Sequence, residues 1–126
     1  MPNANSRHLK LKAKLLKKEP INLYEQIQVP IVTIDKVVND DSIETIFLLK
    51  IDVEGSELKV LYGAAESLKS KRIKNIQIEI HHNDFRENYK KEIFDLLFEY
   101  DYLHQFSLKH YFGNFTEEFF ILNEPN

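Results

Sequence analysis

The chain has 126 residues and a formal net charge of −3, with 43% hydrophobic and 29% charged residues, which is typical of one soluble globular domain. Cysteine is absent, which excludes disulfides, thiolate zinc sites and cysteine nucleophiles. The three glycines, Gly55, Gly63 and Gly113, are too scattered to form a glycine-rich phosphate or dinucleotide loop. No apolar run approaches the roughly 20 residues of a membrane span. We therefore expect a protein of a reducing compartment, the cytoplasm.

Residues 1–28 form a basic N-terminal arm in this interpretation, and residues 29–126 form the folded part. The first 20 residues contain six basic side chains and one acidic side chain, Glu19. Such an arm can bind an anionic partner such as nucleic acid, or it can be a solvated helix or a leader without fixed structure. Because the rest of the chain is acidic, we do not expect nucleic acid as a partner.

The hydrophobic pattern of the folded part alternates between strands and helices. Residues 29–34 are β-branched and predict a strand, with Asp35 as the N-cap of a short helix over 36–39. Residues 46–53 are continuously apolar, as in strands buried on both faces of a parallel sheet. A helix over 58–71 follows, in which Gly63 either admits close packing or marks a kink.

Four further elements complete the chain, and they are a strand over 76–80, a helix over 89–100 and two strands over 102–108 and 118–122. Alternating strands and helices predict an α/β fold with a parallel sheet, to which the last two strands add an antiparallel pair.

Acidic residues and histidines cluster where the two strongest strands end. Because ligands of open α/β sheets bind at the carboxyl ends of the parallel strands, these residues should meet at one edge if the strands are neighbours. Carboxylates and imidazoles can serve there as acid and base, or as cation ligands. The candidates are Asp52, Glu54, Glu79, His81 and Asp84.

Each candidate also has a structural interpretation. Lys50 lies in an apparently buried strand, so it is either paired with Glu79 or catalytic. Asp52 either caps the next helix or acts chemically, and Glu54 fits a favourable charge at a helix start. His81 and His82 are weak metal ligands as a pair, because neighbouring strand residues point to opposite faces.

The central segment resembles a known family. LKIDVEGSE at residues 49–57 is similar to the lKiDvEGaE signature of the FkbM family of S-adenosylmethionine-dependent methyltransferases. Three flanking segments also match the family's pattern, in the same order, so that the match covers about residues 29–84. These segments are Thr33-Ile34-Asp35, VLYGA at 60–64 and IQIEIH at 76–81. The resemblance implies a partial Rossmann-like methyltransferase sheet and O-methylation of a hydroxyl on a sugar or natural product, with S-adenosylmethionine as cofactor.

The resemblance also implies roles for residues at the sheet edge. By position, Asp52 and Glu79 would hold the acceptor or remove its proton, with Glu54, His81 and Lys50 beside them. The acceptor would be a small molecule or a glycan. Related methyltransferases bind a divalent cation at these strand ends, but nothing in this sequence indicates a metal.

The chain departs from the family in its cofactor-binding half. The family places its cofactor on two earlier strands with a glycine-rich turn, and neither is visible before residue 29. We therefore expect the C-terminal half of a methyltransferase, truncated or split, with cofactor-binding residues unknown and stand-alone activity doubtful. Residues 46–53 would then form an exposed apolar edge. Such an edge predicts that the chain associates with itself, that it pairs with a complementing N-terminal chain, or that residues 30–34 cover the edge. The alternative function is a non-catalytic interaction module that binds a partner through this edge.

Overall fold

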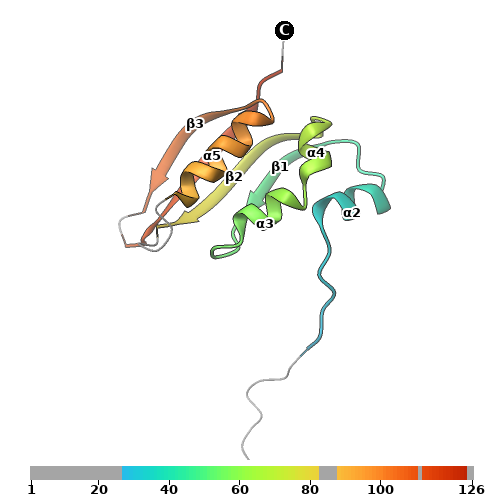
Figure 1. The fold of residues 1–126 in the computed structure, drawn as a ribbon, viewed down its shortest axis with the longest axis horizontal. Helices are drawn as coiled ribbons and strands as arrows, with labels where there is room; N and C mark the ends of the chain where they lie inside the picture. Colours follow the sequence, from blue (N-terminus) through green and yellow to red (C-terminus); the bar gives the residue numbers. More distant parts are fainter. Residues whose placement is uncertain (1–26, 83–87, 111, 125–126) are drawn as a thin grey trace, which may run out of the picture. The chain divides into compact units, whose positions relative to one another are not determined.

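The computed structural model describes residues 27–82, 88–110 and 112–124. Its elements belong to one compact unit, residues 31–126 (Figure 1). In chain order they are α2 (Ile34–Asp40), β1 (Ile46–Ile51), α3 (Glu57–Tyr62), α4 (Ala65–Lys69), β2 (Ile73–His81), α5 (Tyr89–Glu99), β3 (Tyr102–Lys109) and β4 (Phe115–Leu122). Within the part of the chain that the structure describes, no helix is long and apolar enough to cross a bilayer.

The four strands form one sheet in the order β1-β2-β4-β3. β1 and β2 run parallel, with Ile51 opposite Ile78, and β4 runs antiparallel to both β2 and β3. This arrangement confirms the predicted α/β fold with parallel strands and a C-terminal antiparallel pair. It also makes the two strongest predicted strands neighbours, so their carboxyl ends lie at the same edge.

The core lies on one face of the sheet, which α3, α4 and α5 cover in Figure 1. Alternate residues of β2 point into this core, which is why Ile76, Ile78 and Ile80 are fully buried while Gln77 and Glu79 between them are not. Burying each such side chain contributes about 1.5–3 kcal/mol. Helices α3, α4 and α5 add five buried leucine and isoleucine side chains to this core, those of Leu58, Leu61, Leu68, Ile93 and Leu97.

β1 forms one edge of the sheet within the described residues. Phe47 is 79% exposed and Leu48 is 49% exposed, so the predicted apolar edge is confirmed. The prediction that residues 30–34 cover it is wrong: residues 30–33 join no strand, Ile34 begins α2, and Ile31 is almost fully exposed. Lys50 was expected to be buried, but its side chain is about half exposed because β1 is an edge strand.

The strand predicted over 29–34 is wrong. A helix, α2, begins at Ile34 instead, and its N-cap is Thr33 rather than Asp35. The Thr33 side chain accepts a hydrogen bond from the backbone N–H of Lys36, at 3.1 Å. This capping bond stabilises the first helical turn, so it outweighs the β-preference of the preceding branched residues.

Asp35 links α2 to α4 instead of capping its own helix. Its carboxylate accepts bonds from the backbone N–H groups of Glu66 and Ser67, both at 2.9 Å, and from the Ser67 hydroxyl at 2.6 Å. The predicted helix over 58–71 is divided at Gly63 into α3 and α4. A Cβ at Gly63 would lie 3.3 Å from Thr33, so both the predicted kink and the predicted close packing are confirmed.

Asp35→Ala is expected to lower the free energy of unfolding by about 1–3 kcal/mol, because it leaves two helix N–H groups and the hydroxyl of the buried Ser67 without their acceptor. Urea unfolding followed by circular dichroism measures this. The control is Asp40→Ala, which removes an exposed ion pair with Lys36 and should cost less than about 0.5 kcal/mol. Equal losses in the two variants would contradict the role given to Asp35.

Candidate active site

The carboxyl ends of β1 and β2 bring together four of the five acidic and histidine candidates. Asp52 follows β1 directly, and Glu79 and His81 lie near the carboxyl end of β2. The register pairs Ile51 with Ile78, so the next residues, Asp52 and Glu79, lie at the same level of adjacent strands. Asp84 lies outside the described residues.

A tight turn connects β1 to α3. Glu54 and Gly55 both have positive φ angles, 47° and 96°, a conformation that glycine adopts freely and that is uncommon for glutamate. The backbone N–H of Gly55 donates to the carboxylate of Glu57 at 2.8 Å. Glu57 also accepts a bond from the Tyr89 hydroxyl at 2.6 Å, so this fully buried residue ties the turn to the start of α5.

The turn rules out the capping role considered for Asp52. The N-cap of α3 is Ser56, without a side-chain capping bond, so Asp52 does not cap this helix. Glu54 lies within the turn and is exposed. Asp52 and Glu54 both precede α3, at the carboxyl end of β1.

The charged side chains on the face opposite the helices form two pairs. Lys50 lies 3.8 Å from Asp52, and His81 Nε2 lies 3.3 Å from Glu79 Oε1. The predicted Lys50–Glu79 pair is therefore not formed, whereas the expected placement of Glu79 and His81 on one face is confirmed. His81 Nδ1 is buried and has no partner among the described residues.

The residue after β3 and the strand β4 add a second imidazole and a second carboxylate beside the first pair. Phe115 pairs with His81 across the strands, and their rings are 5.5 Å apart. His110 stacks on the same phenyl ring at 4.5 Å and lies 3.5 Å from Glu117 Oε2. Glu79 and Glu117 are register partners. Sequence reasoning missed this contribution, because it depends on β4 pairing directly with β2.

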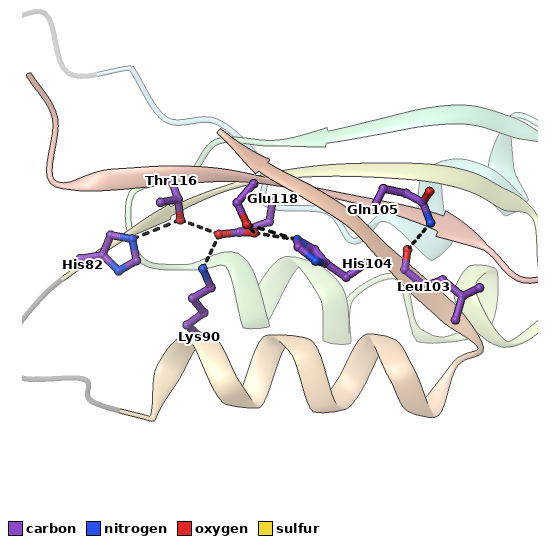
Figure 2. Close-up of polar contacts among 8 residues, drawn as sticks. His82, Lys90, Leu103, His104, Gln105, Thr116 and Glu118 are labelled. Carbon is purple, nitrogen blue, oxygen red and sulfur yellow. Dashed lines mark hydrogen bonds and ion pairs between the residues drawn. The ribbon is translucent and has the colours of Figure 1, made fainter. Parts of the chain in front are cut away.

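A second polar cluster lies on the helix-covered face, centred on the buried carboxylate of Glu118 (Figure 2). Its Oε1 accepts bonds from Lys90 of α5 and from Thr116, the latter at 2.7 Å. Its Oε2 accepts bonds from Ser107 and from His104 Nε2, the latter at 2.9 Å. Thr116 in turn contacts His82 Nε2 at 3.1 Å, which connects the cluster to the carboxyl end of β2.

Burial alone would raise the pKa of Glu118, because it disfavours the charged form. The hydrogen bonds from Lys90, Ser107, Thr116 and His104 outweigh burial and hold the pKa of Glu118 below its ordinary value. Glu118 is therefore an ionised carboxylate at neutral pH, with a donor at each of the four positions where it can accept.

The sheet edge offers chemistry for positioning a hydroxyl and for moving its proton. Within residues 27–82, 88–110 and 112–124, no group of three or more histidine and acidic side chains is arranged to hold a metal ion.

One hollow of about 410 Å³ is lined by Val38, Asn39, Ser42, Ile43, Glu44 and Arg72. It lies next to the residues that precede β1, at the end of the parallel strands opposite to the candidate site.

The comparison with known protein families finds one match. The chain matches a family model described as "Methyltransferase FkbM domain" over residues 2–103. No curated protein and no solved structure matches the chain. The matched range includes the turn after β1 and all four candidates of the sheet edge.

Proposed function

Because this chain belongs to the FkbM methyltransferase family, we propose that it serves O-methylation, in which S-adenosylmethionine supplies a methyl group to a hydroxyl of a sugar or natural product. The observation that carries the proposal is the meeting of Asp52 and Glu79 at the carboxyl ends of two adjacent parallel strands. This edge is where open α/β sheets bind their ligands.

Asp52 and Glu79 are the acceptor-side residues in this proposal. A carboxylate accepts a hydrogen bond from an acceptor hydroxyl and so orients its oxygen for in-line attack on the methyl carbon. Lys50, 3.8 Å from Asp52, and His81, 3.3 Å from Glu79, hold these carboxylates. Glu54 lies in the adjoining turn as a further acidic group.

The donor fits this edge in one respect. S-adenosylmethionine carries a positive sulfonium, and the edge presents the exposed carboxylates of Asp52 and Glu54. When bound, the donor supplies an activated methyl group. The described residues contain no glycine-rich turn after a strand, so we assign no residue to its nucleotide part. The proposal includes a complementing N-terminal half that supplies this part, supported by the open edge of β1.

The division into a basic arm at 1–28 and a methyltransferase part at 29–126 belongs to the same proposal, as does a location in the cytoplasm. The absence of cysteine supports the latter.

A second candidate function is a non-catalytic module that binds another protein strand at β1. The exposed side chains of Phe47 and Leu48 favour it, as does the side of β1 on which no other described strand pairs. Added strands pair through main-chain hydrogen bonds, with side-chain contacts giving specificity. This function needs none of the carboxylates at the sheet edge.

Methyl transfer separates the two functions. The tagged chain is purified from its natural host with whatever binds it, and transfer of a tritiated methyl group from S-adenosylmethionine to an extract of hydroxylated small molecules is measured. Asp52→Asn and Glu79→Gln are each expected to reduce the rate roughly a hundredfold or more. The control, Glu124→Gln, lies at the far end of the sheet beside Lys74 and should keep the rate. No transfer by the unaltered protein, or full rates in both variants, contradicts the proposal.

A further inference from the structure

An irregularity in β3 places three apolar side chains on one face of that strand. Regular alternation would put Leu103 and Phe106 on opposite faces, because they are three residues apart. The register with β4 shifts between His104 and Phe106, so β3 accommodates one extra residue there. Leu103, Phe106 and Leu108 therefore pair with alternate residues of β4, whose intervening residues are buried under the helices. These partners in β4 are, in the same order, Ile121, Phe119 and Glu117.

The apolar side chains of β3 and β4 on the face away from the helices form a continuous surface. We call it the apolar strip, and its members are Leu103, Phe106, Leu108, Phe119 and Ile121. The rings of Phe106 and Phe119 stack at 4.5 Å. The other three members and Phe106 are each between 41% and 51% exposed. A group of exposed apolar side chains of this kind is typical of a surface that binds a partner.

The half of the same face formed by β1 and β2 is polar apart from Leu48. On its other side β4 pairs with Asn75, Gln77 and Glu79 of β2, and Lys50 of β1 pairs with Gln77. A partner that covered the whole face would bury the Lys50 charge and these polar groups, which costs free energy unless each has a hydrogen bond. The surface that favours contact is therefore two strands wide.

A single α-helix has the dimensions of the apolar strip. Two neighbouring strands span about 10 Å, and a helix with its side chains is about 10–12 Å across. Successive rows of the strip are two residues apart along the strand, about 6.8 Å, and helix residues at i, i+4 and i+8 recur about every 6 Å. A sheet face presents side chains only, and a helix satisfies its own main-chain hydrogen bonds, so this contact leaves no backbone group unpaired.

The carboxylates beside the strip determine which charge the helix should carry. Glu117 lies opposite Leu108 in the third row, and Glu79 lies opposite Glu117 on the other side. Like charges that face each other across a strand pair repel. Within the described residues their ionic partners are the imidazoles of His81 and His110, and imidazole is not permanently charged at neutral pH. Lysine or arginine of a partner would offset this repulsion.

We propose that the apolar strip binds an amphipathic α-helix of a partner protein, with its apolar stripe on β3 and β4 and with lysine or arginine on the flank nearest β2. Nucleic acids and anionic membranes do not fit, because the carboxylates repel them. A second copy of this chain fits less well, because two strips in contact would bury Glu117 of both copies. The contact requires neither Asp52 nor the open edge of β1, so it is independent of methyl transfer.

Calorimetric titration of the full chain with designed helical peptides of about 15 residues tests the proposal. Two peptides share one leucine stripe, and their flanks carry lysine in one and glutamate in the other. A third peptide has the composition of the lysine peptide in an order that scatters the leucines. The lysine peptide is expected to bind roughly tenfold or more tightly than either of the others. No binding of the lysine peptide, or equal binding of the lysine and glutamate peptides, overturns the proposal.

Variants of the chain test the place of binding. Phe106→Ser and Leu108→Ser are each expected to weaken binding of the lysine peptide roughly tenfold or more, because each removes an apolar side chain that the helix would bury. The control is Leu48→Ser, which removes a 49% exposed leucine from the polar half of the same face and should leave binding unchanged. Glu117→Gln should reduce the preference for lysine over glutamate flanks. Circular dichroism checks that each variant is folded.

Two outcomes of these measurements overturn the place of binding. One is unchanged binding in both strip variants, and the other is an equal loss in Leu48→Ser. Sedimentation velocity tests the competing occupant. If the free chain is a dimer that Phe106→Ser dissociates, a second copy occupies the strip and the proposal fails.

Discussion

Replacing Glu118 by alanine is expected to lower the free energy of unfolding by about 2–4 kcal/mol. The substitution leaves the buried hydroxyl of Thr116, the half-buried His104 N–H and the exposed hydroxyl of Ser107 without their acceptor. Each unsatisfied buried group costs about 1–3 kcal/mol, and partial relaxation reduces the sum. Lys90 adds less, because its side chain is 38% exposed and can turn to water.

Urea unfolding measures this loss. The matched control is Glu124→Ala, which removes an exposed carboxylate bound to Lys74 and should change stability by less than about 0.5 kcal/mol. A loss for Glu118→Ala no larger than the control would show that the cluster does not stabilise the fold.

The same carboxylate should produce part of the acid sensitivity of the protein. Its pKa is lower in the folded chain than in the unfolded chain, so the folded state binds the proton more weakly. The stability it contributes is fully present above the unfolded pKa, near 4.5, and is lost as pH falls through the lower folded value. Glu118→Gln should flatten the decline in unfolding free energy below about pH 4.5. An unchanged decline would contradict this assignment.

Phe47→Lys with Leu48→Lys is expected to abolish strand-mediated association of the chain. Burial of each apolar side chain contributes about 1.5–3 kcal/mol, so each substitution should weaken association roughly ten- to a hundredfold. Lysine on an edge strand also opposes pairing with another strand. Sedimentation velocity over a range of concentrations measures this, for the purified chain and for any complex it forms in its host.

The control for the edge is Phe98→Lys. Phe98 is about half exposed, like Leu48, but it lies on α5, which packs mainly against β3 and α3. If Phe98→Lys weakens association as much as the β1 substitutions do, the interaction surface lies elsewhere. A chain that stays monomeric and binds no partner at any concentration contradicts the pairing itself.

Sequence patterns predicted the elements whose side chains face the core. β2 was predictable because Ile76, Ile78 and Ile80 alternate, and β1 because its run is continuously apolar. The start of α2 was not predictable in this way. The capping bond of the Thr33 hydroxyl favours a helix there over the extended conformation that the preceding residues prefer. Asp35 was predicted as a cap, but the helix it caps is 31 residues further along the chain.

The candidate site was predictable only in part. The family signature and the strand ends gave Asp52 and Glu79, since both follow from local sequence. Glu118 carried a usable signal, because Thr116, Glu118, Phe120 and Leu122 alternate on one face of a strand and place a carboxylate among buried residues. Its partners Lys90 and His104 come from other elements, so their convergence depends on the fold. The contact of His82 with Thr116 likewise requires β4 to lie beside β2.

The central position of β4 affects how the protein is made. β4 is the last of the described strands along the chain, yet it lies between β2 and β3 and pairs with both. During synthesis on the ribosome, β2 and β3 therefore emerge with nothing between them, and their apolar edges stay open until residue 122 has left the exit tunnel. We expect nascent chains that stop before Phe115 to depend on chaperones, and the sheet to close in one late step when β4 inserts.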